Sequence, residues 1–161
     1  MSPSHIGLSM FAATVMVTGL AFADHSTVRS DHEHPRYVFE AEPHLVLAPF
    51  HDGGVGAGFA GTINIVDRGF IQRLNDSVGI NFAANWATNE HFVLSAAMQW
   101  NFWFTEHWSA FGEPGFAIGT HDDLHLWPHL GAGGRYAFND SIALTLRVGF
   151  PVSSVGVSFF L

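Results

Sequence analysis

The sequence from residue 43 onward alternates strongly, with large apolar residues at every second position. The pattern is clearest where Ile142, Leu144, Leu146, Val148 and Phe150 alternate with Ser141, Ala143, Thr145, Arg147 and Gly149. A period of two is the period of a β-strand, in which successive side chains point to opposite faces. No apolar run in the chain approaches the ~20 residues that a membrane-spanning helix needs. The pattern therefore predicts an all-β fold.

Turn-forming residues divide this region into eight predicted strands. The first is the least regular, because Leu45, Val46 and Leu47 are consecutive apolar residues. The four connections at the predicted outer end are short, and the longest of these runs from Thr120 to His125. The predicted strands are Pro43 to His51, Gly54 to Ile65, Ser77 to Trp86, Phe92 to Phe104, Trp108 to Ile118, Leu126 to Phe138, Ser141 to Phe150 and Ser153 to Leu161.

The residue types on the two faces of these strands indicate which face points out of the barrel. A soluble, lipocalin-like barrel would turn its apolar face inward and show water a charged face. Here the less apolar face is Gly, Ala, Ser, Thr and Asn, with charges only at Glu113, Arg135 and Arg147. Only 12% of the chain is charged, against about 25% in a soluble domain. We therefore expect the bulky face to meet lipid and the small face to fill a narrow lumen. The prediction is an eight-stranded antiparallel up-and-down transmembrane β-barrel.

An even number of strands puts both chain ends on one side, which we expect to be the periplasm. The turns at 105–107 and 139–140 then fall on that side, where short turns belong. The longer connection, residues 66–76, is interpreted as an interfacial turn, with a periplasmic plug or docking point as the alternative. Membrane-interface aromatic residues are predicted from the same topology: Trp86, Phe92, Trp100, Phe104, Trp108, Tyr136, Phe138 and Phe159.

The N-terminal region is interpreted as two segments that precede the barrel of residues 43–161. Residues 1–23 are typical of a cleaved signal peptide, since an apolar stretch ends in Ala21-Phe22-Ala23. A short buried helix is the alternative interpretation. Residues 24–42 contain several His and Asp residues without apolar periodicity and are predicted to be a flexible tail.

The residues from Pro43 onward resemble the small eight-stranded outer-membrane barrels of the OmpA/OmpX type. Val155, Val157, Phe159 and Leu161 are similar to the alternating C-terminal strand that the barrel-assembly machinery recognises, although such strands usually end on an aromatic residue. Residues 136–144 resemble the hairpins of that class. The resemblance implies outer-membrane lipids and the assembly machinery as partners, and location in the outer membrane of a Gram-negative bacterium. It implies an architecture and no particular activity.

Polar residues on the small face form a predicted lumenal core. Burial in a low-dielectric interior forces charges to pair, so we expect Glu113 to contact both Arg135 and Arg147. We interpret the core as structural ion pairs that fill the lumen, with a ligand or proton path as the alternative. The predicted set is Glu113, Arg135, Arg147, Gln99, Asn101 and His129.

Imidazole and carboxylate groups gather at the outer end of this topology. They are a plausible ligand set for a divalent transition metal, although their spacing is not diagnostic. The ordinary interpretation is polar loop residues in a chain that has no Lys. The candidate metal ligands are His51, His91, His121, Asp122, Asp123 and His125.

Other functions fit the sequence less well. His107-Trp108-Ser109 resembles the His-x-Ser element of outer-membrane lipid A deacylases, but no acidic residue follows at a comparable spacing. The net charge of −8 argues against nucleic acid, and the absence of Cys excludes thiolate metal sites. We therefore expect a non-enzymatic, envelope-associated structural barrel without a cofactor. The alternatives are a metal- or small-ligand-binding barrel and, third, a lipid-modifying enzyme.

Overall fold

The computed structural model describes residues 34–48, 54–71, 74–88, 91–121 and 123–161. The side chains of Ala48, His91, Thr120, His121 and Asp123 are not among the described parts. The predicted signal peptide and most of the predicted tail lie outside the described residues. Within them, no helix is long and apolar enough to cross a membrane.

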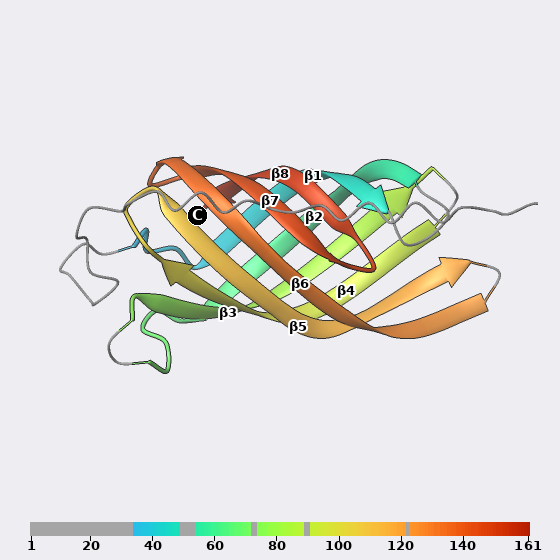
Figure 1. Cartoon of the computed structure of the whole chain (residues 1–161), viewed down its shortest axis with the longest axis horizontal. Helices are drawn as coiled ribbons and strands as arrows, with labels where there is room; N and C mark the ends of the chain where they lie inside the picture. The colour runs from blue at the N-terminus through green and yellow to red at the C-terminus, as the bar shows by residue number, and fades with distance from the viewer. Residues whose placement is uncertain (1–33, 49–53, 72–73, 89–90, 122) are drawn as a thin grey trace, which may run out of the picture.

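Eight antiparallel strands form a closed barrel in which each strand pairs with its neighbours in sequence and β8 pairs with β1 (Figure 1). The predicted fold class is therefore confirmed. The strands are β1 (Phe39–Ala48), β2 (Gly54–Val66), β3 (Asp76–Ala87), β4 (His91–Trp103), β5 (Trp108–His121), β6 (Asp123–Asn139), β7 (Ile142–Phe150) and β8 (Ser153–Phe160).

The barrel has two distinct ends. We call the one where β1 begins and β8 stops the terminal end, on the left in Figure 1. The β2–β3, β4–β5 and β6–β7 turns share this end, and the other four turns lie at the far end. Two turns at the terminal end are closed by side chains. Asn139 Oδ1 accepts hydrogen bonds from the backbone N–H groups of Ser141 and Ile142, both at 2.9 Å. Thr105 Oγ1 accepts one from Trp108 N at 2.9 Å.

Strand alternation sorts the side chains as the sequence predicts. In β7, Ala143, Thr145 and Arg147 are buried in the lumen, whereas Leu144 and Leu146 are 45% and 57% exposed on the outer surface. The same sorting holds for Glu40, Glu42, Glu113 and Arg135, whose side chains are buried in the lumen. Asp76, at an outward position at the start of β3, is also buried, and its Oδ2 accepts a hydrogen bond from Trp100 Nε1 on the outer side of the wall. A surface of exposed apolar side chains around a charged interior is the reverse of a soluble protein.

The start of the barrel was predicted wrongly. β1 runs from Phe39 to Ala48, four residues earlier than the predicted strand, so the predicted tail boundary at residue 42 is wrong. Within β1, Leu45 and Leu47 are exposed while Val46 is 1% exposed, so these consecutive apolar residues do alternate. The inward positions Glu40 and Glu42 are buried. Charged residues at inward positions conceal this strand from a search for apolar periodicity.

The far end also differs from the sequence prediction. β5 and β6 extend to His121 and Asp123, which pair with each other, so most of the predicted loop from Thr120 to His125 is a long hairpin. On its other side β6 pairs with β7 only from Leu130 onward. The β5–β6 hairpin consequently extends beyond its neighbours (Figure 1).

Candidate functional site

The lumen is crossed by Arg147 of β7, whose guanidinium lies between Glu113 of β5 and Glu42 of β1. Nε and Nη2 donate to Glu113 Oε2 and Oε1 at 2.7 and 3.2 Å. Nη1 and Nη2 donate to Glu42 Oε1 and Oε2 at 2.6 and 3.0 Å, and Nη1 also donates to Ser154 Oγ at 3.2 Å. A guanidinium has five N–H donors in a planar fork, so these five hydrogen bonds satisfy it completely. One side chain thus ties β7 to β1, β5 and β8.

A second ion pair lies nearer the terminal end. Arg135 of β6 donates from Nη2 to Glu40 Oε2 at 2.9 Å and from Nη1 to Asn101 Oδ1 at 2.6 Å. The ring of Phe111 lies between the two arginines, with guanidinium carbons 4.3 Å (Arg135) and 5.2 Å (Arg147) from its centroid. Cation–π attraction adds to the ion pairs in this buried interior.

All six residues of the predicted lumenal core lie in the interior and are buried. Gln99 Nε2 donates to Glu113 Oε1 at 2.7 Å, and His129 Nε2 lies 3.9 Å from Glu113 Oε2. The predicted pairing is wrong for one partner, since Arg135 pairs with Glu40 while Glu113 binds Arg147. The sequence analysis missed Glu40 and Glu42 because it assigned both to the tail.

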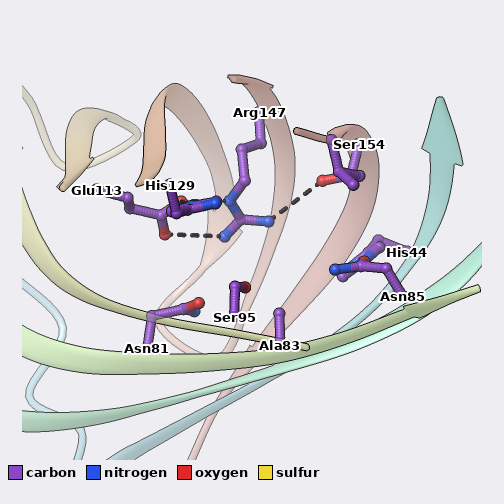
Figure 2. A pocket seen from close by; sticks show the side chains of 10 residues that line it. His44, Asn81, Ala83, Asn85, Ser95, Glu113, His129, Arg147 and Ser154 are labelled. Atoms are coloured by element: carbon purple, nitrogen blue, oxygen red, sulfur yellow. Dashed lines mark hydrogen bonds and ion pairs between the residues drawn. The ribbon is translucent and has the colours of Figure 1, made fainter. Parts of the chain in front are cut away.

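A small polar cavity lies next to Arg147 inside the barrel (Figure 2). The volume that the centre of a water molecule can occupy in this cavity is about 20 Å³. By the same measure, a cavity that holds one water needs roughly 10–15 Å³. His44 closes one side, with its Nε2 2.7 Å from Asn85 Oδ1. The cavity therefore has room for one or two waters and too little for a metabolite. Its lining is His44, Asn81, Ala83, Asn85, Ser95, Glu113, His129, Arg147, Val152 and Ser154.

An apolar floor closes the lumen at the terminal end. Tyr37, Trp103, Ala137, Ala143 and Phe160 form one buried cluster, in which the rings of Tyr37 and Phe160 are 4.7 Å apart. Burial raises the pKa of the Tyr37 phenol above its ordinary value, so this floor stays uncharged. The segment before β1 continues the floor, because His34 stacks on Trp103 with ring centroids 5.8 Å apart.

Of the six candidate metal ligands, one, His125, has a described side chain. His51 and Asp122 lie outside the described residues, as do the side chains of His91, His121 and Asp123. His125 is exposed, and its ring is 5.8 Å from that of Trp127. Among the described residues, no three His, Asp or Glu side chains are arranged to hold a metal ion.

The His-x-Ser segment at residues 107–109 is split between two environments. Ser109 is buried inside the barrel. His107 is exposed in the β4–β5 turn, with its ring 5.9 Å from that of Tyr136. An acyl-transfer site requires the base within hydrogen-bond reach of the nucleophile. These two residues do not form such a pair in this structure.

The predicted interface aromatics lie on the outer surface. Trp86, Phe92, Phe104, Trp108, Phe138 and Phe159 are exposed, and Trp100 and Tyr136 are half-buried. At the terminal end the rings form contacts, with Tyr136 4.9 Å from Trp108 and 5.4 Å from Phe138. Aromatic rings in rows at the two ends of an apolar surface are the pattern of membrane interfaces.

The sequence matches no protein-family model and no curated protein. The fold does match solved structures. A de novo designed transmembrane β-barrel is 13% identical with a TM-score of 0.61, covering 80% of this chain and 99% of the designed one. The chain has the fold of a transmembrane β-barrel. The predicted resemblance to small eight-stranded outer-membrane barrels is therefore confirmed for the fold.

Two further solved structures have a similar fold. The outer membrane protein Ail of Yersinia pestis, solved in a phospholipid bilayer nanodisc, is 10% identical with a TM-score of 0.52, covering 78% of this chain and 100% of Ail. A second designed barrel, TMB2.3, is 14% identical with a TM-score of 0.51, covering 81% of this chain and 98% of the design. Identities this low concern the fold alone.

Proposed function

We propose that this chain is an integral outer-membrane protein of a Gram-negative bacterium and serves as a non-enzymatic structural component of the envelope. The observation that carries the proposal is the position of Arg147, which carboxylates of β1 and β5 bind on both sides, so that these side chains together span the lumen. An eight-stranded barrel has an interior just wide enough for side chains, so such a plug blocks passage.

Membrane insertion is supported by the outer surface. Leu45, Phe59, Leu94, Phe116, Leu130 and Leu146 are exposed on six different strands, with no described charged side chain among the exposed strand residues. Each strand has nine or more residues except β8, which has eight. A membrane-spanning strand needs about 9–11 residues, and Leu161 continues β8 by accepting and donating backbone hydrogen bonds with Phe39.

The same proposal orients the barrel. With a cleaved signal peptide at residues 1–23, both ends of the mature chain face the periplasm, and the terminal end is the periplasmic end. The β8 pattern of Val155, Val157 and Phe159 is then the segment that the barrel-assembly machinery recognises. The far end, with the long β5–β6 hairpin, faces the cell exterior.

A structural role is favoured over transport because the lumen is closed at two levels. The ion pairs of Arg147 close its middle, and the aromatic floor of Tyr37, Trp103 and Phe160 closes its periplasmic end. The buried guanidinium is fully hydrogen-bonded, so opening a path would leave charges unpaired at a cost of several kcal/mol. A fully satisfied polar core is suited to rigidity.

Two measurements test the proposal. Purified protein in a planar lipid bilayer is expected to give no conductance steps, and regular ion currents would contradict the closed lumen. Cells that lack the protein are expected to become more permeable to large apolar dyes, with the lipid A mass spectrum unchanged. A lipid A species that appears only when the protein is present would instead establish an enzyme.

A further inference from the structure

The β2–β3 turn differs in character from the other two turns at the terminal end. Two apolar residues of this turn, Phe70 and Ile71, are 70% and 39% exposed. The corresponding positions of the β4–β5 and β6–β7 turns are polar, with Glu106 and Asp140 exposed. An exposed Phe-Ile pair at this place in a turn calls for a physical reason.

Backbone hydrogen bonds join the described residues on the two sides of this turn. Gly69 N donates to Asp76 O at 2.7 Å, and Leu74 N donates to Ile71 O at 3.0 Å. Gly69 also packs so closely on the carboxylate of Asp76 that a Cβ at this position would clash with it. The residue before Phe70 is therefore held against the first residue of β3.

The turn returns to the lipid-facing side of the wall. The ring of Phe70 meets the indole of Trp100 edge-on, with centroids 6.3 Å apart, and Trp100 is 5.1 Å from Phe102. Both β4 residues face away from the lumen, since their neighbours Gln99 and Asn101 are buried within it. Trp100 is itself held at the start of β3, because its Nε1 donates to Asp76 Oδ2 at 2.9 Å. Phe70 thus extends the outer apolar surface beyond the last strand residues.

We propose that Phe70 and Ile71 form a membrane anchor that inserts into the phospholipid leaflet on the periplasmic side of the membrane. This inference rests on the proposed membrane location of the barrel. The occupant is lipid because the surface is continuous with the lipid-facing wall at Trp100 and Phe102. Aromatic side chains favour this interfacial depth, and the exposed Arg68 next to the tip is suited to a lipid phosphate.

Site-directed fluorescence tests this anchor directly, because the chain contains no Cys. Phe70→Cys and, separately, Ile71→Cys would be labelled with an NBD fluorophore and the protein reconstituted into phosphatidylcholine vesicles. Vesicles that carry nitroxide on the lipid headgroup or at the acyl-chain end then report the depth of the label. Glu106→Cys on the same rim is the matched control, and Leu146→Cys on the wall is the control for insertion.

The two labels in the β2–β3 turn are expected to emit at shorter wavelength than the label at 106. They should be quenched several-fold more by headgroup nitroxide than by chain-end nitroxide. If labels at 70 and 71 behave like the label at 106 while the label at 146 is quenched, the anchor is wrong and the membrane barrel stands. If the label at 146 also escapes lipid nitroxide, the proposed membrane location itself fails. Shielding of 70 and 71 from both lipid and aqueous quenchers would indicate protein contact and overturn the anchor.

Discussion

Arg135 and Glu40 form an ion pair in the barrel interior, with Arg135 Nη2 2.9 Å from Glu40 Oε2 and both side chains almost completely buried. The two residues are 95 positions apart in the chain and come from β6 and β1. Since β1 also closes the barrel by pairing with β8, this ion pair fixes the strand on which closure depends.

Glu40→Ala is expected to destabilise the barrel by about 3–5 kcal/mol, because it leaves a buried guanidinium without a carboxylate. Unfolding in urea from lipid vesicles measures the change. Asp140→Ala, in the exposed β6–β7 turn, is the control and should change the free energy of unfolding by about 0.5 kcal/mol or less. Glu40→Leu combined with Arg135→Leu should cost less than the sum of the two single substitutions. Equal effects of Glu40→Ala and Asp140→Ala would show that the ion pair is absent.

Arg147→Lys is expected to destabilise the barrel more than Glu113→Gln. A lysine has three donors on one nitrogen, so it cannot reproduce the five hydrogen bonds of the guanidinium, and the loss is about 3 kcal/mol or more. Glu113→Gln keeps an acceptor for Arg147, which retains its bidentate contact with Glu42. Unfolding free energies in the same lipid give the comparison. The reverse order would mean that Arg147 is not the residue that holds β1, β5 and β7 together.

Two neighbouring substitutions in β7 distinguish its two faces. Leu146→Arg places a charge on the outer surface and should cost about 2–4 kcal/mol if it lies near the bilayer centre. Ala143→Trp should block assembly, because Ala143 has no exposed surface and its neighbours fill the lumen. The heat-modifiable shift of the folded band on unboiled gels reports assembly. Normal assembly of Ala143→Trp would contradict the tight lumen.

Titration with zinc, nickel and copper is expected to leave the thermal unfolding midpoint unchanged. The reason is that the spacing of the candidate ligands in the sequence is not diagnostic of a metal site, so polar loop residues are the ordinary interpretation. Specific binding to the folded state would raise the midpoint with metal concentration. A rise that His91→Ala or His121→Ala removes would establish the metal-binding alternative.

Strand number, order and facing could be predicted from the sequence because they depend on local alternation. In β7 the residues Leu144 and Leu146 point outward and Thr145 inward, as their period of two requires. The lumenal positions of Glu113 and Arg147 follow from the same count. Membrane strands with small inward residues give a clear signal, because lipid tolerates only apolar side chains on the other face.

Charge pairing in the lumen could not be predicted from alternation alone. Glu40 and Glu42 look like part of a polar tail because they are charged, yet the lumen is where a strand of this barrel places its charges. One signal could have identified them. Two lumenal arginines with a single lumenal carboxylate, Glu113, leave an uncompensated positive charge, which a low-dielectric interior does not tolerate. That imbalance indicates a missing acidic strand.

The apolar floor could not be predicted either, because its residues are far apart in the sequence. Tyr37, Trp103 and Phe160 come from three segments that meet only when β1 closes against β8. Trp103 and Phe160 lie at inward positions at strand ends, where the alternation is hardest to phase. Only the three-dimensional arrangement brings these rings together.

Fractionation of the native protein tests the central claim, that the apolar wall of the barrel meets lipid, most directly. Cells that express the unmodified chain would be separated into soluble, inner-membrane and outer-membrane fractions, and the membranes washed with alkaline carbonate. We predict that the protein remains in the outer-membrane fraction after the wash and dissolves only with detergent. Recovery of folded protein as a soluble monomer without detergent would contradict the account.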